Sequence, residues 1–253
     1  MKKILLFLCV IGVAAMMTSC LERSENFQEA SFVYIAVAEN GVIYGRTIGR
    51  FTQTITSPQI QQGYITPPGT TNFIQIVPGD FFEIFYAWDE ANDFTELEER
   101  VYAHNVTILG MSNRFERGHW SSAPASEPMY RIAALASTFV SSPTYWGDNW
   151  IISYRFYGGR DTPPTLSFHK REISETNANE VTIDIDVRIH GVPQVTNPHR
   201  VDDAVVLNMM DLRRELQRET NLGVIVRFHF YQPNSNNPTS IISPRWMIAG
   251  TSQ

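Results

Sequence analysis

The clearest segment of the sequence is residues 180–190, EVTIDIDVRIH, in which apolar and polar side chains alternate. Five apolar side chains would share one face of a strand: Val181, Ile183, Ile185, Val187 and Ile189. Five polar side chains would share the other face: Thr182, Asp184, Asp186, Arg188 and His190. Such alternation is typical of an antiparallel strand with one buried and one solvent-facing side. It predicts a β-sheet domain built around this strand.

The pattern returns in residues 224–231, VIVRFHFY. Other apolar runs bounded by turn residues predict further strands, at 150–157, 166–172, 204–208 and 241–249. One helix is predicted over 211–220 (DLRRELQRET), where Leu212 and Leu216 lie one turn apart. Six strands and a short helix favour an antiparallel β-sandwich over residues 148–253.

A smaller β domain is predicted for residues 30–111. Apolar runs on both sides of the Asn40-Gly41 turn give a strong hairpin signal. Residues 81–88 (FFEIFYAW) form the strongest strand of this region. About five short strands separated by turns favour a small OB-like barrel. Residues 112–147 are predicted to be a linker or long loop between the two domains.

Composition bounds the classes of function. The chain has 253 residues, 43% of them hydrophobic and 18% charged, which suffices for packed cores. Its formal net charge of −6 argues against a nucleic-acid partner. Both cysteines, Cys9 and Cys20, lie in the first twenty residues. Disulfides, cysteine-ligated metals and thiol nucleophiles are therefore excluded from the rest of the chain.

The N-terminus has the pattern of a secretory signal. Lys2 and Lys3 precede an apolar stretch, residues 4–17, that is too short to span a bilayer as a helix. Met17-Thr18-Ser19-Cys20 resembles the lipobox of bacterial lipoproteins, which implies cleavage after residue 19 and lipid on the Cys20 sulfur. We expect residues 20–29 to be a tether and the protein to be anchored in the outer membrane of the cell envelope, in either leaflet.

Three stretches resemble the NigD-like lipoproteins of the Bacteroidetes. They are Val77-Pro78-Gly79-Asp80 with the strand up to Asp89, Asp148-Asn149-Trp150 with the strand up to Tyr157, and Asn208-Met209-Met210-Asp211-Leu212 with the rest of the helix up to Leu216. The resemblance implies a lipoprotein signal, an N-terminal OB-like domain and a C-terminal β-sandwich. It implies no established biochemical activity.

Histidines and carboxylates offer two chemical hypotheses. His190 and His229 lie on predicted polar faces, and if their strands were neighbours, with His169 nearby, these histidines would form a metal site with Asp184 or Asp186. Asp184 and Asp186 would also lie ~6.6 Å apart along one strand, which suits a glycosidase pair. Solvated side chains on a wet sheet face are the competing interpretation, and we predict no catalytic residue, metal or cofactor.

Aromatic side chains offer a third hypothesis. Trp120, Tyr145 and Trp146 lie in the predicted linker, where loops often carry binding residues. They are candidates for a platform that stacks on a sugar or peptide, as are Phe85, Tyr86 and Trp88 in their strand. Core packing is the competing interpretation, because aromatic side chains commonly pair across strands.

Together these patterns predict a lipid-anchored envelope protein with a non-catalytic binding or accessory role. Its partner would be a polysaccharide or an envelope protein, in addition to the membrane that holds Cys20. An envelope glycan hydrolase is the first alternative. A pilus or adhesin subunit is the second.

Overall fold

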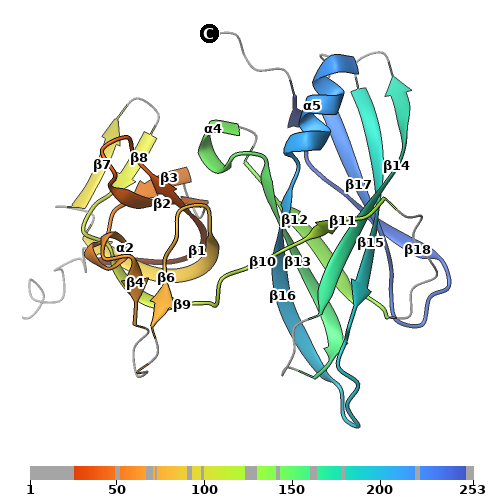
Figure 1. Cartoon of the computed structure of the whole chain (residues 1–253), viewed down its shortest axis with the longest axis horizontal. Helices are drawn as coiled ribbons and strands as arrows, with labels where there is room; N and C mark the ends of the chain where they lie inside the picture. The colour runs from red at the N-terminus through yellow and green to blue at the C-terminus, as the bar shows by residue number, and fades with distance from the viewer. Residues whose placement is uncertain are drawn as a thin grey trace, which may run out of the picture. The chain divides into compact units, whose positions relative to one another are not determined.

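The computed structural model describes residues 26–248 apart from 49–51, 67–70, 72, 90–92, 98–99, 123–129, 141–142, 160–163, 178–179 and 220–222. The chain divides into two compact units, Met1–Arg114 and Phe115–Gln253, each with its own core. Strands dominate both units, which confirms the mainly-β class (Figure 1). The predicted signal peptide and Cys20 lie outside the described residues. Within those residues no helix is long and apolar enough to cross a bilayer.

The first unit is a seven-stranded sheet that curls into a half-barrel (Figure 1). Its strands, in the order in which they pair, are β7 (Phe94–Leu97), β8 (Arg100–Ala103), β3 (Thr52–Ile55), β2 (Ile43–Ile48), β1 (Asn26–Val37), β6 (Phe81–Asp89) and β9 (Thr107–Met111). A short helix and a two-stranded sheet complete the unit: α2 (Pro58–Gln61), β4 (Tyr64–Ile65) and β5 (Ile74–Gln75). The predicted hairpin is confirmed, with Val37 opposite Ile43 and Gly41 at φ +82° in the turn.

A polar network lies among the apolar side chains of this half-barrel. The Tyr86 hydroxyl donates to Glu29 Oε2 at 3.1 Å, accepts a hydrogen bond from Gln53 Nε2 and lies 3.5 Å from Thr47 Oγ1. Thr47, Gln53 and Tyr86 are buried. Burial raises the pKa of the Tyr86 phenol above its ordinary value, and the Glu29 carboxylate adds to the rise.

The second unit is a sandwich of two sheets with an apolar core between them. One sheet has the order β10 (Glu116–Arg117), β16 (His199–Asn208), β13 (Asn149–Gly158) and β12 (Ala134–Thr138). The other has the order β11 (His119–Trp120), β14 (Thr165–Asn177), β15 (Glu180–His190), β17 (Gly223–Tyr231) and β18 (Pro238–Ile242), with β19 (Trp246–Met247) also paired to β17. The predicted helix is found as α5 (Met210–Glu219).

The segment expected to be a linker, 112–147, instead supplies strands to both sheets of this sandwich. β10 pairs in parallel with β16 in one sheet, and β11 pairs in parallel with β14 in the other. Between them lies Gly118, where an added Cβ would come within 2.6 Å of the Phe168 ring. The chain therefore crosses from one sheet to the other where only glycine fits. Strands of two residues are too short to show periodicity, which explains why the sequence pattern misses them.

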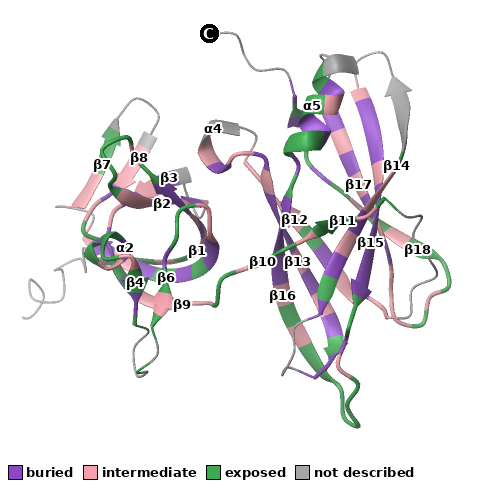
Figure 2. Ribbon diagram, viewed as in Figure 1, coloured by how far each residue is buried: buried purple, intermediate pink, exposed green. Residues whose placement is uncertain are grey.

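Strand β15 differs from its expected form in two ways. It lies inside its sheet and pairs in parallel with β17, because the chain crosses to β16 and α5 before it returns. Most of the strand is buried (Figure 2). The polar positions of its outer face share this burial: Asp186 is 5% exposed, Arg188 is 7% exposed and Thr182 is buried as well. The solvent-facing side predicted for this strand is thus covered by long side chains from its neighbours.

One buried ion pair joins three segments of the sandwich. Arg213, in α5, donates from Nε to Asp148 Oδ1 at 2.5 Å, just before β13 begins. Its Nη1 donates to the carbonyl oxygens of Met247 and Ile248 at 2.9 and 3.0 Å. Its Cζ lies 4.8 Å from the centroid of the Trp246 ring. One guanidinium therefore holds the helix against the start of β13 and the C-terminal strand β19.

Replacement of Arg213 by Met should lower the free energy of unfolding of the second unit by about 3–5 kcal/mol, because Asp148 would remain buried without its cation. Urea unfolding of the full chain measures the loss. The control is Arg214→Met on the same helix, whose exposed pair with Asp211 is worth less than about 0.5 kcal/mol. Equal losses in the two variants would contradict the role given to Arg213.

The raised pKa of Tyr86 predicts a pH dependence for the first unit. The folded state holds the phenolic proton more tightly than the unfolded state, so the stabilisation is complete below the ordinary pKa of 10 and is lost as the pH rises above it. Between about pH 9 and 11.5, unfolding should become easier in the wild type than in Tyr86→Phe, each measured against its own stability at pH 7. Tyr64→Phe, at an exposed tyrosine, is the control and should follow the wild type. Parallel curves for all three proteins would refute the prediction.

Candidate functional site

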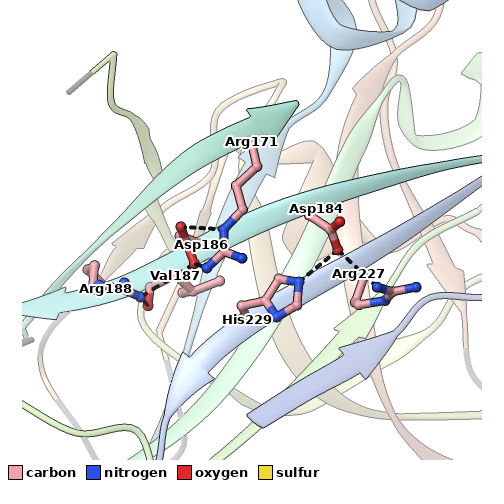
Figure 3. Close-up of polar contacts among 7 residues, drawn as sticks. All are labelled: Arg171, Asp184, Asp186, Val187, Arg188, Arg227 and His229. Carbon is pink, nitrogen blue, oxygen red and sulfur yellow. Dashed lines mark hydrogen bonds and ion pairs between the residues drawn. The ribbon is translucent and has the colours of Figure 1, made fainter. Parts of the chain in front are cut away.

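Charged side chains gather on the outer face of the sheet that contains β15 (Figure 3). We call this set the charged face: Arg131, Arg171, Asp184, Asp186, Arg188, Arg227, His229 and Tyr231. The strand register creates it. Parallel pairing of β15 with β17 sets Asp184 beside Arg227 and Asp186 beside His229.

Asp186 is held by two arginines. Arg171 donates from Nε to Oδ2 at 2.8 Å and from Nη2 to Oδ1 at 2.5 Å, a two-point fork. Arg188 Nη1 lies 3.9 Å from Oδ1. The hydrogen bonds to Asp186 raise the pKa of Arg171 above its ordinary value. A shift in the β14–β15 register between Lys170 and Ile173 accompanies the placement of Arg171.

Arg188 is an uncommon buried arginine. Its Nη1 donates to the carbonyl of Val187 at 3.1 Å, and its Cζ lies 4.9 Å from the centroid of the Tyr231 ring. Arg131 lies over the same ring, at 5.2 Å. Burial lowers the pKa of Arg188, Asp186 opposes this effect, and the neighbouring Arg171 and Arg131 lower the pKa further. Burial of this positive charge therefore costs free energy on folding.

A second group forms around Asp184. His229 Nε2 lies 2.7 Å from Asp184 Oδ1, and Arg227 Nη1 lies 3.4 Å from the same oxygen. Asp184 and Asp186 therefore share one face, as the alternation predicts, but each carboxylate is bonded to side chains from neighbouring strands. A general acid must instead be able to reach the leaving group of a substrate, and both carboxylates are occupied by contacts within the protein.

The three histidines proposed for a metal site take separate partners. His169 Nδ1 bonds to the carbonyl of Ser121 at 3.0 Å, His190 Nε2 bonds to Ser167 Oγ at 2.7 Å, and His229 bonds to Asp184. Their strands are neighbours, but the side chains do not point to one place. No group of three potential metal ligands occurs among the residues that the structure describes.

The three aromatic candidates have different environments. Trp146 is 0% exposed, so the expectation that it stacks on a ligand is wrong. Trp120 is 40% exposed, and its Nε1 donates to the carbonyl of Asn208 at 2.8 Å. Tyr145 is half-buried. In the first unit Tyr86 and Trp88 are buried, and Phe85 is exposed. A binding role for Trp120 and Tyr145 stays a prediction.

Sequence reasoning missed Arg131, Arg171 and Tyr231 as parts of one site. Arg171 and Tyr231 continue the polar side of strands that the alternation identifies, so that pattern was a usable signal. Arg131 precedes β12 of the other sheet, and the backbone N–H of the next residue, Ile132, donates to the carbonyl of Tyr231 at 2.9 Å, which sets the two segments side by side. No local pattern in the sequence predicts such a contact.

No family model matches the chain, and no curated protein matches it. Among solved structures, an uncharacterized protein from Parabacteroides merdae is similar, with a TM-score of 0.54, 11% identity, and coverage of 87% of this chain and 99% of that chain. A NigD-like immunity protein from Bacteroides caccae also matches, with a TM-score of 0.47, 12% identity, and coverage of 85% and 90%. The first likeness shows a shared fold.

The contacts of the charged face predict which of its two aspartates matters more for stability. Asp186→Asn should lower the free energy of unfolding of the second unit by about 3–5 kcal/mol, because it leaves Arg188 buried without its carboxylate. Asp184→Asn should cost less, since Arg227 remains one-third exposed to solvent. Urea unfolding of both variants tests the ranking. A larger loss for Asp184→Asn would show that Asp186 is not the central counter-charge.

Proposed function

We propose that the protein is a non-catalytic binding protein of the cell envelope and that the charged face is its recognition surface. The observation that supports this function is the position of the charged side chains on the interior strands of a well-packed sheet. Binding residues on such a rigid support keep their geometry before the partner arrives, which lowers the entropy lost on binding.

The same geometry weighs against the hydrolase alternative. A glycosidase needs one carboxyl group that keeps its proton near neutral pH. Asp186 accepts the two-point fork from Arg171, and Asp184 contacts Arg227 and His229. Both carboxylates are therefore engaged by cationic side chains of the protein itself, and neither is placed to hand a proton to a glycosidic oxygen.

The proposal also includes a location for the protein at the membrane. The lipobox-like Met17-Thr18-Ser19-Cys20 supports a lipid on Cys20 and an outer-membrane location. Several acyl chains would give stable anchoring, whereas one chain gives marginal binding. The protein would then present its charged face to envelope polysaccharide from a fixed position on the membrane.

A matched pair of surface variants tests the recognition surface. Ile242 is 61% exposed and lies opposite Arg227 in the register of β17 and β18. Tyr157 is 52% exposed in β13, in the other sheet. We expect the full chain to retain polysaccharide extracted from the envelope of the producing organism. Ile242→Glu should weaken retention at least tenfold, because the new carboxylate would pair with Arg227 and occupy the charged face, and Tyr157→Glu should leave it unchanged.

Four results would overturn parts of the proposal. No retention by the wild type, or equal retention by the two variants, would remove the charged face as the recognition surface. Glycan turnover by the wild type that is lost in Asp184→Asn would establish the hydrolase instead. Palmitate labelling that persists in Cys20→Ser would place the lipid elsewhere or refute the lipoprotein assignment.

A further inference from the structure

The charged face is unbalanced around Tyr231. Arg131 and Arg188 both lie over its ring, and Arg188 shares Asp186 with Arg171. In the part of the chain that the structure describes, three guanidinium groups thus lie around Tyr231 and Asp186, and Asp184 is the next carboxylate along the strand. Among the described residues Arg131 makes its polar contact with a carbonyl oxygen, that of Ser235 at 3.0 Å, and with no carboxylate.

This excess of positive charge is partly withdrawn from water. Arg188 is buried, which removes most of the solvent that would otherwise screen it from Arg131 and Arg171. Burial is the main cause that lowers the pKa of Arg188; Asp186 and Tyr231 raise it, and the repulsion from Arg171 and Arg131 lowers it. An added anion would relieve the repulsion, so the site favours one before any specific contact is counted.

Part of the cluster can reach a ligand. The Arg171 side chain is 42% exposed, and its fork to Asp186 uses Nε and Nη2, which leaves the N–H groups of Nη1 outside the fork. Arg131 and Tyr231 are half-buried. Guanidinium groups match the planar, two-oxygen geometry of a carboxylate. The site can therefore add a second carboxylate to the one it already holds.

The net charge of the chain limits which class of molecule can bring this carboxylate to the site. A net charge of −6 repels densely charged polymers such as nucleic acid at long range. A sugar chain that carries isolated carboxylates escapes most of this repulsion, since each acidic unit meets the cluster alone. The same chemistry is present in a free acidic monosaccharide.

We infer that Arg131, Arg171 and Arg188, gathered around Tyr231, bind the carboxylate of an acidic sugar, either free or within a glycan. The inference rests on the proposed function and names the chemistry that the charged face recognises. Arg131 and Arg171 contact the ligand, and buried Arg188 supplies a fixed positive field behind them. Asp186 orients Arg171 and keeps the cluster folded in the absence of ligand.

Titration calorimetry of the full chain, purified in a mild detergent, tests the inference with glucuronate and with glucose as its uncharged counterpart. We expect glucuronate to bind with a Kd below about 10 mM and glucose not to bind in that range. Arg131→Gln and Arg171→Gln should each weaken glucuronate binding about tenfold or more. A galacturonate oligomer that binds more tightly than glucuronate would identify a glycan as the source, and equal affinities would identify the free sugar.

Arg200→Gln is the matched control, because Arg200 is an exposed arginine of the other sheet that pairs with Asp202. It should leave glucuronate affinity unchanged. Equal binding of glucose and glucuronate, equal losses in all three variants, or no binding of glucuronate would overturn the inference. If the envelope polysaccharide is still retained and still lost in Ile242→Glu, the proposed function stands and only the acidic-sugar assignment fails.

Discussion

The buried pair of Asp148 and Arg213 is the interaction on which the second unit depends. Asp148 also receives, on its carbonyl oxygen, a hydrogen bond from the backbone of Met209 at 2.7 Å. Asp148 thus contacts the helix segment twice, through its carbonyl oxygen where α5 begins and through its carboxylate at Arg213. Arg213 in turn donates to the carbonyl oxygens at the end of β19 and just after it. A buried ion pair adds little net stability compared with apolar packing, but it permits few arrangements of its partners. We attribute the one defined position of α5 at the end of the sandwich to this restriction.

With the end of the sandwich fixed, the charged face follows from strand pairing. The chain leaves β15, forms β16 and α5, and returns as β17 in parallel beside the strand it left. This return sets two acidic positions of β15 against a basic residue and a histidine of β17. An antiparallel return would reverse the order of the β17 residues along β15 and change these pairs. The electrostatics of the face is therefore a property of the topology as much as of the composition.

The sequence predicted the parts of this fold that local patterns encode. Alternation in residues 180–190 and 224–231 identified the two central strands and the face on which Asp184, Asp186 and His229 lie, and Leu212 with Leu216 identified the helix. It could not predict that β15 and β17 are parallel, because side-chain alternation is the same in either direction. Nor could it predict that Arg188 is buried, since the Tyr231 ring that packs against it comes from another strand. Trp146 failed as a binding candidate for a related reason: an aromatic residue in a Pro- and Gly-rich stretch is compatible with exposure and with burial.

The crossing at Gly118 bears on where this protein can be divided. Because β10 and β11 lie at the outer edges of the two sheets, they pair with backbone groups of β16 and β14 that would otherwise face water. A fragment cut at residue 148, where the sequence suggests a domain to begin, would lose these strands and β12 as well. It would present long unpaired edges, which readily join to other chains. The second unit begins near Phe115, so β10 and β11 are part of the sandwich itself and complete one edge of each of its two sheets.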